Sequence, residues 1–357
     1  MKNSRIASLD GIRAISIALV FLMHADGTRG FPAWRISNFV GDLGHLGVTV
    51  FFVISGYLIT TLLINEFSAS GTVSLKDFYA RRALRILPAA YVYLLVIAVA
   101  TWLSWIAIRR VDFLAAIAYL TNYDAHRPWY VGHLWSLAVE EQFYFLWPLL
   151  FVWLGQRRAL FVALAAFLAA PVVRAAMHLM IAPGPYRDLE IFPAVADGIA
   201  IGCAFAILRP RLLAQNWYVR TTASRAMWLL LPLIILINRF DGYTLVDFFG
   251  SPLKLVAITV LIEASTRHAA TRMGKFLNSA PMIFAGTLSY SLYLWQQPFL
   301  NRHLDSWLTT FPLNIAIAIT AAICSYYLVE RPFLRMRRRY AGRTSPTADS
   351  TPSLLET

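Results

Sequence analysis

The sequence predicts an all-α, polytopic membrane protein, a bundle of about ten transmembrane helices with both termini in the cytoplasm. Hydrophobic residues make up 58% of the 357 residues, charged residues only 14%, and the mean hydropathy is +0.58. Soluble domains carry about a quarter charged residues. The apolar residues also gather in runs long enough to cross a bilayer as helices, and Lys and Arg concentrate in alternate loops.

Each predicted span is an apolar run between polar or charged loops. The ten spans are 9–26, 43–65, 84–107, 136–155, 159–181, 191–208, 226–239, 252–266, 281–300 and 312–330. The stretch 112–121 is too short to cross, so we expect a re-entrant or interfacial helix there, on the outer side of the membrane. Residues 1–335 therefore form one membrane domain, and residues 336–357 are expected to be a basic, then polar, disordered tail.

The orientation follows from the loop charges. Lys and Arg are frequent before the first span, in 76–85, 157–158, 209–225 and 267–275, and in the tail 331–343. They are fewer, or balanced by acids, in 27–42, 182–190, 240–251 and 301–311, with Arg109 and Arg110 as an exception. The positive-inside rule places the first set in the cytoplasm. The net charge of +13 thus belongs to membrane loops, and no basic soluble domain predicts nucleic-acid binding.

Arg13 and His24 are the most informative polar residues, because both interrupt the first apolar run. Eleven helical steps of about 100° leave the two side chains within roughly 20° of each other around the axis, so they share one face. Along the axis they are about 16 Å apart. Ionisable groups inside a membrane helix usually mark a functional site. The arginine suits a charged ligand near one surface, and the histidine suits a base deeper in the bundle. Asp26 is a candidate partner of His24; the alternative is a merely hydrated histidine at the interface.

Arg82 and Arg85 are three residues apart at the cytoplasmic mouth of the third span, so they share a helix face. Paired guanidinium groups suit phosphate, although positive-inside anchoring explains them equally well. Ser55, in the middle of the second span, either lines a site or lets helices approach closely.

Further polar residues fall inside or at the ends of other spans. Glu140 and Glu141 open the fourth span and point to different sides of a helix, so one of them can face an arginine or His24. Tyr144 adds a hydroxyl group, or belongs to an aromatic belt. Glu330 either neutralises Arg13 or Arg85 or reaches out to water. Asp197 in the sixth span is not explained by packing.

Two classes of function agree with these residues. One is a membrane transferase that takes a phosphate-rich donor from the cytoplasm, and the other is a transporter or flippase with buried charges along its path. Internal symmetry, frequent in transporters, is not evident. No CxxC pair or zinc-ligand spacing predicts a metal site.

The order of the motifs resembles the acyltransferase-3 family of bacterial membrane O-acyltransferases. The segments that carry the resemblance are LDGIRAISIALVFLMH, GHLGVTVFFVISGYLIT, FYARRALRILPA, HLWSLAVEEQFYFLWPLL, GTLSYSLYLW and LVERPF, over residues 5–335. The resemblance implies a multi-pass protein of the bacterial inner membrane and an acyl-CoA donor, commonly acetyl-CoA, with no permanently bound cofactor. It implies a carbohydrate acceptor such as lipopolysaccharide or exopolysaccharide.

The resemblance also assigns roles to residues. It implies that Arg13 and His24 are the essential pair and that Arg82 and Arg85 contact the phosphates of CoA. Glu140, Glu141, Ser55 and Glu330 fall within further motifs of the family.

The chain departs from the family pattern at two places. Gln296 and Gln297 stand before Pro298, where the family often has a histidine, and Val195 lies where an arginine often precedes the aspartate of the sixth span. Both departures concern substrate contacts more than the chemistry.

Overall fold

The computed structural model describes residues 7–32, 37–186, 189–240 and 245–337, and every regular element among them is a helix. The predicted tail 336–357 lies almost wholly outside the described residues. In chain order the elements are α1 Ala7–Ala25, α2 Ser37–Ser70, α3 Leu75–Trp102, α4 Arg110–Ile117, η1 Thr121–Tyr123, α5 Trp129–Gly132, α6 Leu134–Met180, α7 Phe192–Val195, α8 Asp197–Leu213, α9 Asn216–Ala223, η2 Arg225–Leu229, α10 Leu230–Arg239, η3 Val246–Gly250, α11 Ser251–Arg267, α12 Arg272–Leu277, α13 Ala280–Phe299, η4 Trp307–Thr309, α14 Leu313–Ser325, η5 Tyr326–Glu330 and α15 Arg331–Arg337. The all-α class is confirmed.

Within the described part of the chain, six helical stretches are long and apolar enough to cross a membrane. A seventh is added if α9 and the helix up to Arg239, bent by 66°, form one span. This agrees with a polytopic membrane protein. Each of the ten predicted runs coincides largely with helix, but the number of crossings and the cytoplasmic position of the termini stay predictions.

Two predicted spans lie within one long element. Helix α6 covers both 136–155 and 159–181, and its backbone leaves the helical conformation at Gly155, where φ is 74°. Glycine adopts this left-handed conformation without a steric penalty. The two halves of α6 are therefore separate helices joined by a tight break, as the sequence predicts. By contrast, the run 191–208 is interrupted, because α7 ends at Val195 and α8 begins at Asp197.

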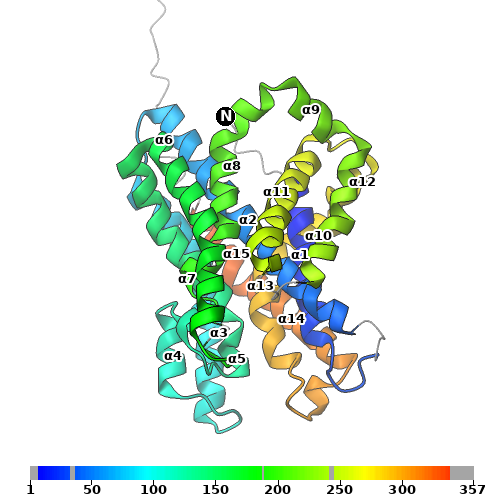
Figure 1. The fold of residues 1–357 in the computed structure, drawn as a ribbon. Coiled ribbons are helices and arrows are strands. Elements are labelled where there is room, and N and C mark those ends of the chain that lie inside the picture. Colours follow the sequence, from blue (N-terminus) through cyan, green and yellow to red (C-terminus); the bar gives the residue numbers. More distant parts are fainter. Residues whose placement is uncertain (1–6, 33–36, 187–188, 241–244, 338–357) are drawn as a thin grey trace, which may run out of the picture.

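The bundle has two ends, which we call the α4 end and the α9 end (Figure 1). Helices α4 and α5 lie together at the first, and α9 and α12 lie at the second. Helix α4 has only 8 residues, about 12 Å, so the stretch around 112–121 is indeed too short to span. Basic loops at the α9 end, such as that holding Arg220 and Arg225, favour this end as the cytoplasmic one.

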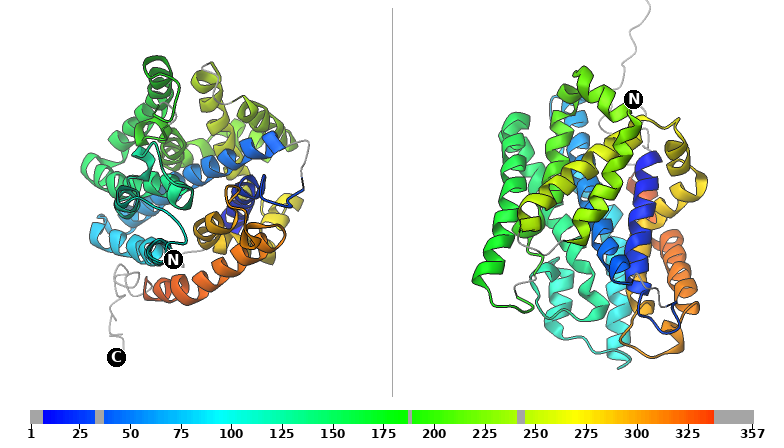
Figure 2. Two further views of the ribbon diagram at one scale, coloured as in Figure 1. Left: turned by 90° about the horizontal axis from the view of Figure 1, so that it is seen from below. Right: turned by 45° about the vertical axis from the view of Figure 1, so that its right-hand side comes forward.

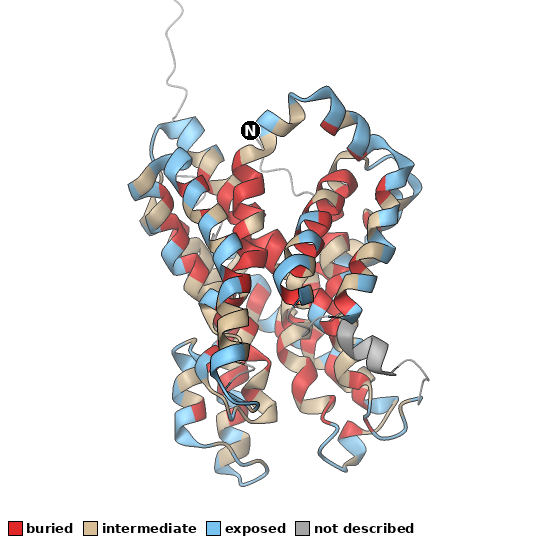
Figure 3. Cartoon of the chain, in the orientation of Figure 1, coloured by how far each residue is buried: buried red, intermediate tan, exposed pale blue. Residues whose placement is uncertain are grey.

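Helices α1, α2, α8 and α13 pack most extensively against one another in the centre (Figure 2). Glycines allow the closest approach: a Cβ added to Gly56 of α2 would lie 2.0 Å from the carbonyl oxygen of Ile199, and one added to Gly202 of α8 would lie 2.2 Å from that of Val53. Buried residues gather where the helices face each other (Figure 3), while large apolar side chains such as Trp153 and Phe161 are exposed on the outer face of α6. Such an outer surface suits lipid.

Candidate active site

Six of the predicted site residues meet in one cavity between helices of the bundle. Its volume is about 90 Å³. Five helices line it: α1 with Arg13 and Val20, α2 with Val48, Phe51, Phe52 and Ser55, α3 with Arg82, Arg85 and Ile86, α6 with Ser136, Leu137, Glu140 and Tyr144, and α13 with Ser289, Tyr290 and Tyr293. Six of the residues singled out from the sequence are among them, although they come from four different helices.

Three arginines give the cavity a positive wall. The guanidinium group of Arg13 lies 3.6 Å from the carboxylate of Asp10, one turn earlier in α1. The guanidinium carbon of Arg82 lies 5.3 Å from the ring centroid of Tyr144, within cation–π range. Arg85 shares the helix face of Arg82, as their spacing predicts. Three cations around one small cavity favour an anionic ligand.

The arginines lie toward the α9 end of the cavity. A Cβ added to Gly11, at the beginning of α1, would lie 2.2 Å from the carbonyl oxygen of Leu277 in α12. Arg13 follows two residues later, and α12 lies at the α9 end (Figure 1). The positive wall therefore faces the side that the loop charges assign to the cytoplasm.

Glu140 is the carboxylate that faces the cavity. Its Oε1 accepts a hydrogen bond of 2.7 Å from the hydroxyl of Ser55, and its Oε2 accepts one of 3.3 Å from Tyr144. Tyr144 also donates to Ser55 Oγ at 3.1 Å. Arg13 and Arg85 are the cations that act on Glu140 electrostatically. Ser55 thus lines the cavity, whereas its neighbour Gly56 makes the close contact with α8. Lining a site and allowing close helix approach, the two alternatives for this motif, therefore apply to adjacent residues.

Glu141 points away from this network. It does not line the cavity, and its Oε1 is buried without a hydrogen-bond partner among the described residues. Its carboxyl group acts electrostatically on the hydroxyl groups of Tyr119 and Tyr290. Adjacent residues of a helix point about 100° apart, so only Glu140 faces the cavity. Arg13 and Arg85 act on Glu140 electrostatically, whereas Arg82 is the arginine that acts on Glu141.

His24 lies beyond the cavity, one turn of α1 past Val20, the last lining residue of that helix. Its Nδ1 is 2.9 Å from the carbonyl oxygen of Val20, and its ring centroid is 5.7 Å from that of Trp129, edge to face. An N–H at Nδ1 donates to this carbonyl and leaves the lone pair on Nε2. A backbone carbonyl of its own helix thus occupies Nδ1, and the expectation that a glutamate or Asp26 orients His24 stays a prediction.

The two remaining carboxylates have partners outside the cavity. Glu330 is buried and accepts a hydrogen bond of 2.9 Å from Ser291, and Arg85 is the cation that acts on it electrostatically. Asp197 forms an ion pair of 2.8 Å with Arg174 of α6. Asp197 thus joins α6 to α8.

Sequence reasoning missed the polar residues of α13. Tyr293 exchanges a hydrogen bond of 2.9 Å with Ser136 and also donates to the backbone carbonyl of His133. Tyr290 donates to the carbonyl of Ile86 at 2.8 Å. The signal was the repeat of polar residues at 289, 290 and 293, which share one face of the helix.

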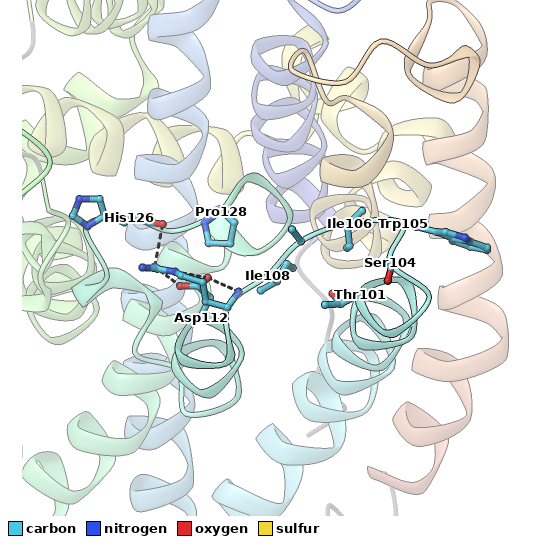
Figure 4. Close-up of a pocket in the computed structure, with 10 residues that line it drawn as sticks. Thr101, Ser104, Trp105, Ile106, Ile108, Asp112, His126 and Pro128 are labelled. Atoms are coloured by element: carbon cyan, nitrogen blue, oxygen red, sulfur yellow. Dashed lines mark hydrogen bonds and ion pairs between the residues drawn. The ribbon is translucent and has the colours of Figure 1, made fainter.

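A second, much more open cavity of about 810 Å³ lies at the α4 end (Figure 4). In it the side chain of Arg109 donates to both carboxylate oxygens of Asp112 at 3.0 and 2.5 Å and to the carbonyl of His126 at 3.3 Å. Burial raises the pKa of Asp112, but the hydrogen bonds from Arg109 outweigh it and hold that pKa below its ordinary value. None of the predicted site residues lines this cavity.

Comparison with known proteins gives a family for the chain. The model of a family described as an acyltransferase domain, Acyl_transf_3, matches residues 6–330. The chain is 28% identical over 357 residues to "Peptidoglycan O-acetyltransferase OatA" of Listeria monocytogenes, covering 92% of this chain and 54% of the relative. It is 28% identical over 372 residues to "Putative O-acetyltransferase SACOL0978" of Staphylococcus aureus, covering 93% of this chain and 58% of the relative.

A third relative is "Putative peptidoglycan O-acetyltransferase YrhL" of Bacillus subtilis, 28% identical over 366 residues, which cover 92% of this chain and 54% of the relative. The chain thus spans a little over half the length of the curated relatives it matches. No solved structure matches it.

Proposed function

Because the chain belongs to the acyltransferase-3 family, we propose that it is a membrane O-acyltransferase that moves an acetyl group from cytoplasmic acetyl-CoA to a hydroxyl of a cell-envelope carbohydrate. The observation that carries the proposal is the arrangement along α1. Arg13 lies at the cavity with Arg82 and Arg85, and His24 lies 11 residues further along the same helix, about 16 Å away.

The arginines supply the binding site for the donor. CoA carries phosphate groups at one end and its thiol at the end of a long, neutral arm. Arg82 and Arg85 bind the phosphates, since paired guanidinium groups match phosphate oxygens. Arg13 is deeper in the same wall. The ends of the donor are then separated along α1, with the charged part at the arginines and the thioester near His24.

The chemistry at His24 is general base catalysis. Nε2 takes the proton of the acceptor hydroxyl as its oxygen attacks the thioester carbon. The new C–O bond forms, the C–S bond breaks, and the imidazolium returns the proton to the departing thiolate of CoA. The hydrogen bond from Nδ1 of His24 to the carbonyl oxygen of Val20 favours the tautomer in which Nε2 is the base. A route through an acetylated His24 uses the same geometry and gives the same products.

The network of Glu140, Ser55 and Tyr144 keeps the middle of the cavity polar. It joins α2 to α6 and places a carboxylate in the same cavity wall as the arginines. We assign it a positioning role toward Arg13 and Arg85. We assign no role in the reaction to Glu141, Asp197 and Asp26, since none of them lines the cavity.

Names of relatives suggest the acceptor class. Two of the similar proteins are named for peptidoglycan O-acetylation, and we propose a cell-envelope glycan of that kind, with other exported polysaccharides as further acceptors to be tested.

The deciding experiment uses purified protein in detergent with labelled acetyl-CoA and a panel of glycans. Formation of an acetyl ester on a glycan, without any sealed vesicle, is the expected result. Movement of acetyl-CoA or glycan across the bilayer of proteoliposomes, with no ester formed, would instead make the protein a transporter.

A further inference from the structure

A group of buried polar side chains lies just beyond the cavity. His133, Gln296 and Gln297 are 5%, 0% and 3% exposed. Among the described residues, both amide atoms of Gln296 and Oε1 of Gln297 have no hydrogen-bond partner, and the ring of His133 has at most the backbone of Leu294. Buried polar groups in proteins nearly always have one. Such atoms on α13, facing the buried ring of His133 at the junction of α5 and α6, indicate a place for a ligand.

The depth of the glutamines follows from two contacts between α1 and the segment around α13. A Cβ added to Gly286 would lie 1.9 Å from the carbonyl oxygen of Asp10. At the other end, Arg302 donates to the carbonyl of Met23 at 3.1 Å. Between these contacts both helices rise about 1.5 Å per residue in the same direction. Gln296 therefore lies at about the depth of Val20, where the cavity ends.

Helix α5 and the start of α6 pack against the part of α13 that carries Gln296 and Gln297. Trp129 donates from Nε1 to the carbonyl of Gln297 at 2.8 Å, and the same indole ring contacts His24. The ring of His133 lies 5.1 Å from that of Tyr293, which lines the cavity. These three side chains thus lie between the end of the cavity and His24.

The chemistry of these atoms limits the ligand. Oε1 atoms accept, the amide nitrogen of Gln296 donates, and a neutral imidazole does one of each. No Lys or Arg is among them, so they do not match phosphate. A secondary amide fits, because its N–H and its C=O point to opposite sides and need an acceptor and a donor on opposite walls. A thioester carbonyl alone would leave the acceptors unpaired.

We propose that His133, Gln296 and Gln297 form a subsite that binds the amide nearest the sulfur in the arm of the acyl donor. This inference rests on the proposed function. The register favours the donor over the acceptor, since the glutamines lie on the cavity side of His24 and the arginines line the same cavity. By holding this amide, the subsite keeps the thioester of the donor next to His24.

The test compares two small acetyl donors. S-acetyl-N-acetylcysteamine keeps the amide, and the thioacetate of pentane-1-thiol replaces it by hydrocarbon of the same length. The unmodified protein is expected to prefer the amide donor about fivefold to tenfold in kcat/KM, the value of one neutral hydrogen bond. Gln296→Leu and Gln297→Leu are expected to lose that preference while their Tm is equal or higher, because an unpaired buried amide is removed.

Gln142→Leu is the matched control. Gln142 is a glutamine of α6 whose Nε2 donates to the carbonyl of Tyr119 at 2.8 Å and to Asn122 at 2.9 Å. This variant is expected to lower Tm and to keep the donor preference.

Several results would overturn the subsite. One is equal use of the two donors by the unmodified protein, and another is a preference that persists in both glutamine variants. A rise in KM for the glycan alone would assign the group to the acceptor, and a lower Tm with intact preference would make it structural. The proposed function itself fails separately, if no ester forms from acetyl-CoA.

Discussion

At the scale of single residues, the position of a group along α1 decides what it does. Arg13 and His24 share a helix face, but only Arg13 reaches the cavity. His24 is held by Val20 and Trp129 beyond its end. The separation of about 16 Å is what allows one helix to serve both ends of a long donor.

His24→Ala is expected to abolish ester formation while the protein still inserts and folds, because the base is lost and little packing is. Removal of a general base costs about 10²- to 10⁴-fold in rate. The measurement is acetyl transfer by purified protein, with His126→Ala, an exposed histidine of the outer loop, as the control. Acylation retained by the His24 variant would remove this histidine from the mechanism.

Arg82→Ala and Arg85→Ala are each expected to raise KM for acetyl-CoA about tenfold or more with a smaller change in kcat, since charge-assisted hydrogen bonds to phosphate are lost. Arg81→Ala is the control, because that arginine instead pairs with Glu66 at 2.9 Å. An unchanged KM in both variants would return the pair to membrane anchoring.

At the scale of elements, close backbone contact between α2 and α8 sets the shape of the cavity. Gly56 of α2 lies against Ile199, and Ser55 beside it faces Glu140. A small shift of α2 therefore moves a cavity wall. The ion pair between Arg174 and Asp197 holds α6 to α8 on the neighbouring side.

Gly56→Ala is expected to destabilise the protein by about 1–3 kcal/mol, because the added methyl group meets backbone that cannot move aside. Thermal unfolding in detergent measures the effect. Gly132→Ala is the matched control, since nothing lies within 4 Å of a Cβ added there. Equal Tm values for the two variants would contradict the close contact.

At the scale of the whole molecule, the charge asymmetry of the loops predicts which end faces the cytoplasm. Basic residues are frequent at the α9 end, whereas the α4 end carries the short helices and the open cavity of Figure 4. With this predicted orientation, the proposed function has the donor enter from the α9 end and the glycan from the α4 end.

Cysteine labelling tests this orientation. Trp105→Cys, an exposed residue at the α4 end, is expected to react with a membrane-impermeant maleimide in intact cells, and Arg220→Cys only after the membrane is opened. Cys324→Ser serves as the background, because Cys324 is the exposed one of the two native cysteines and Cys203 is buried. The reverse pattern would invert the topology and the direction of donor entry.

The sequence alone determined the helical class, the membrane environment and six residues of the cavity wall: Arg13, Ser55, Arg82, Arg85, Glu140 and Tyr144. It did so because hydropathy and the cost of a charge in an apolar helix are local properties. The tertiary structure decided which glutamate faces the arginines, that a backbone carbonyl holds His24, and that Arg174 pairs with Asp197. These pairings join helices far apart in the chain, and no local pattern fixes which faces of two helices meet.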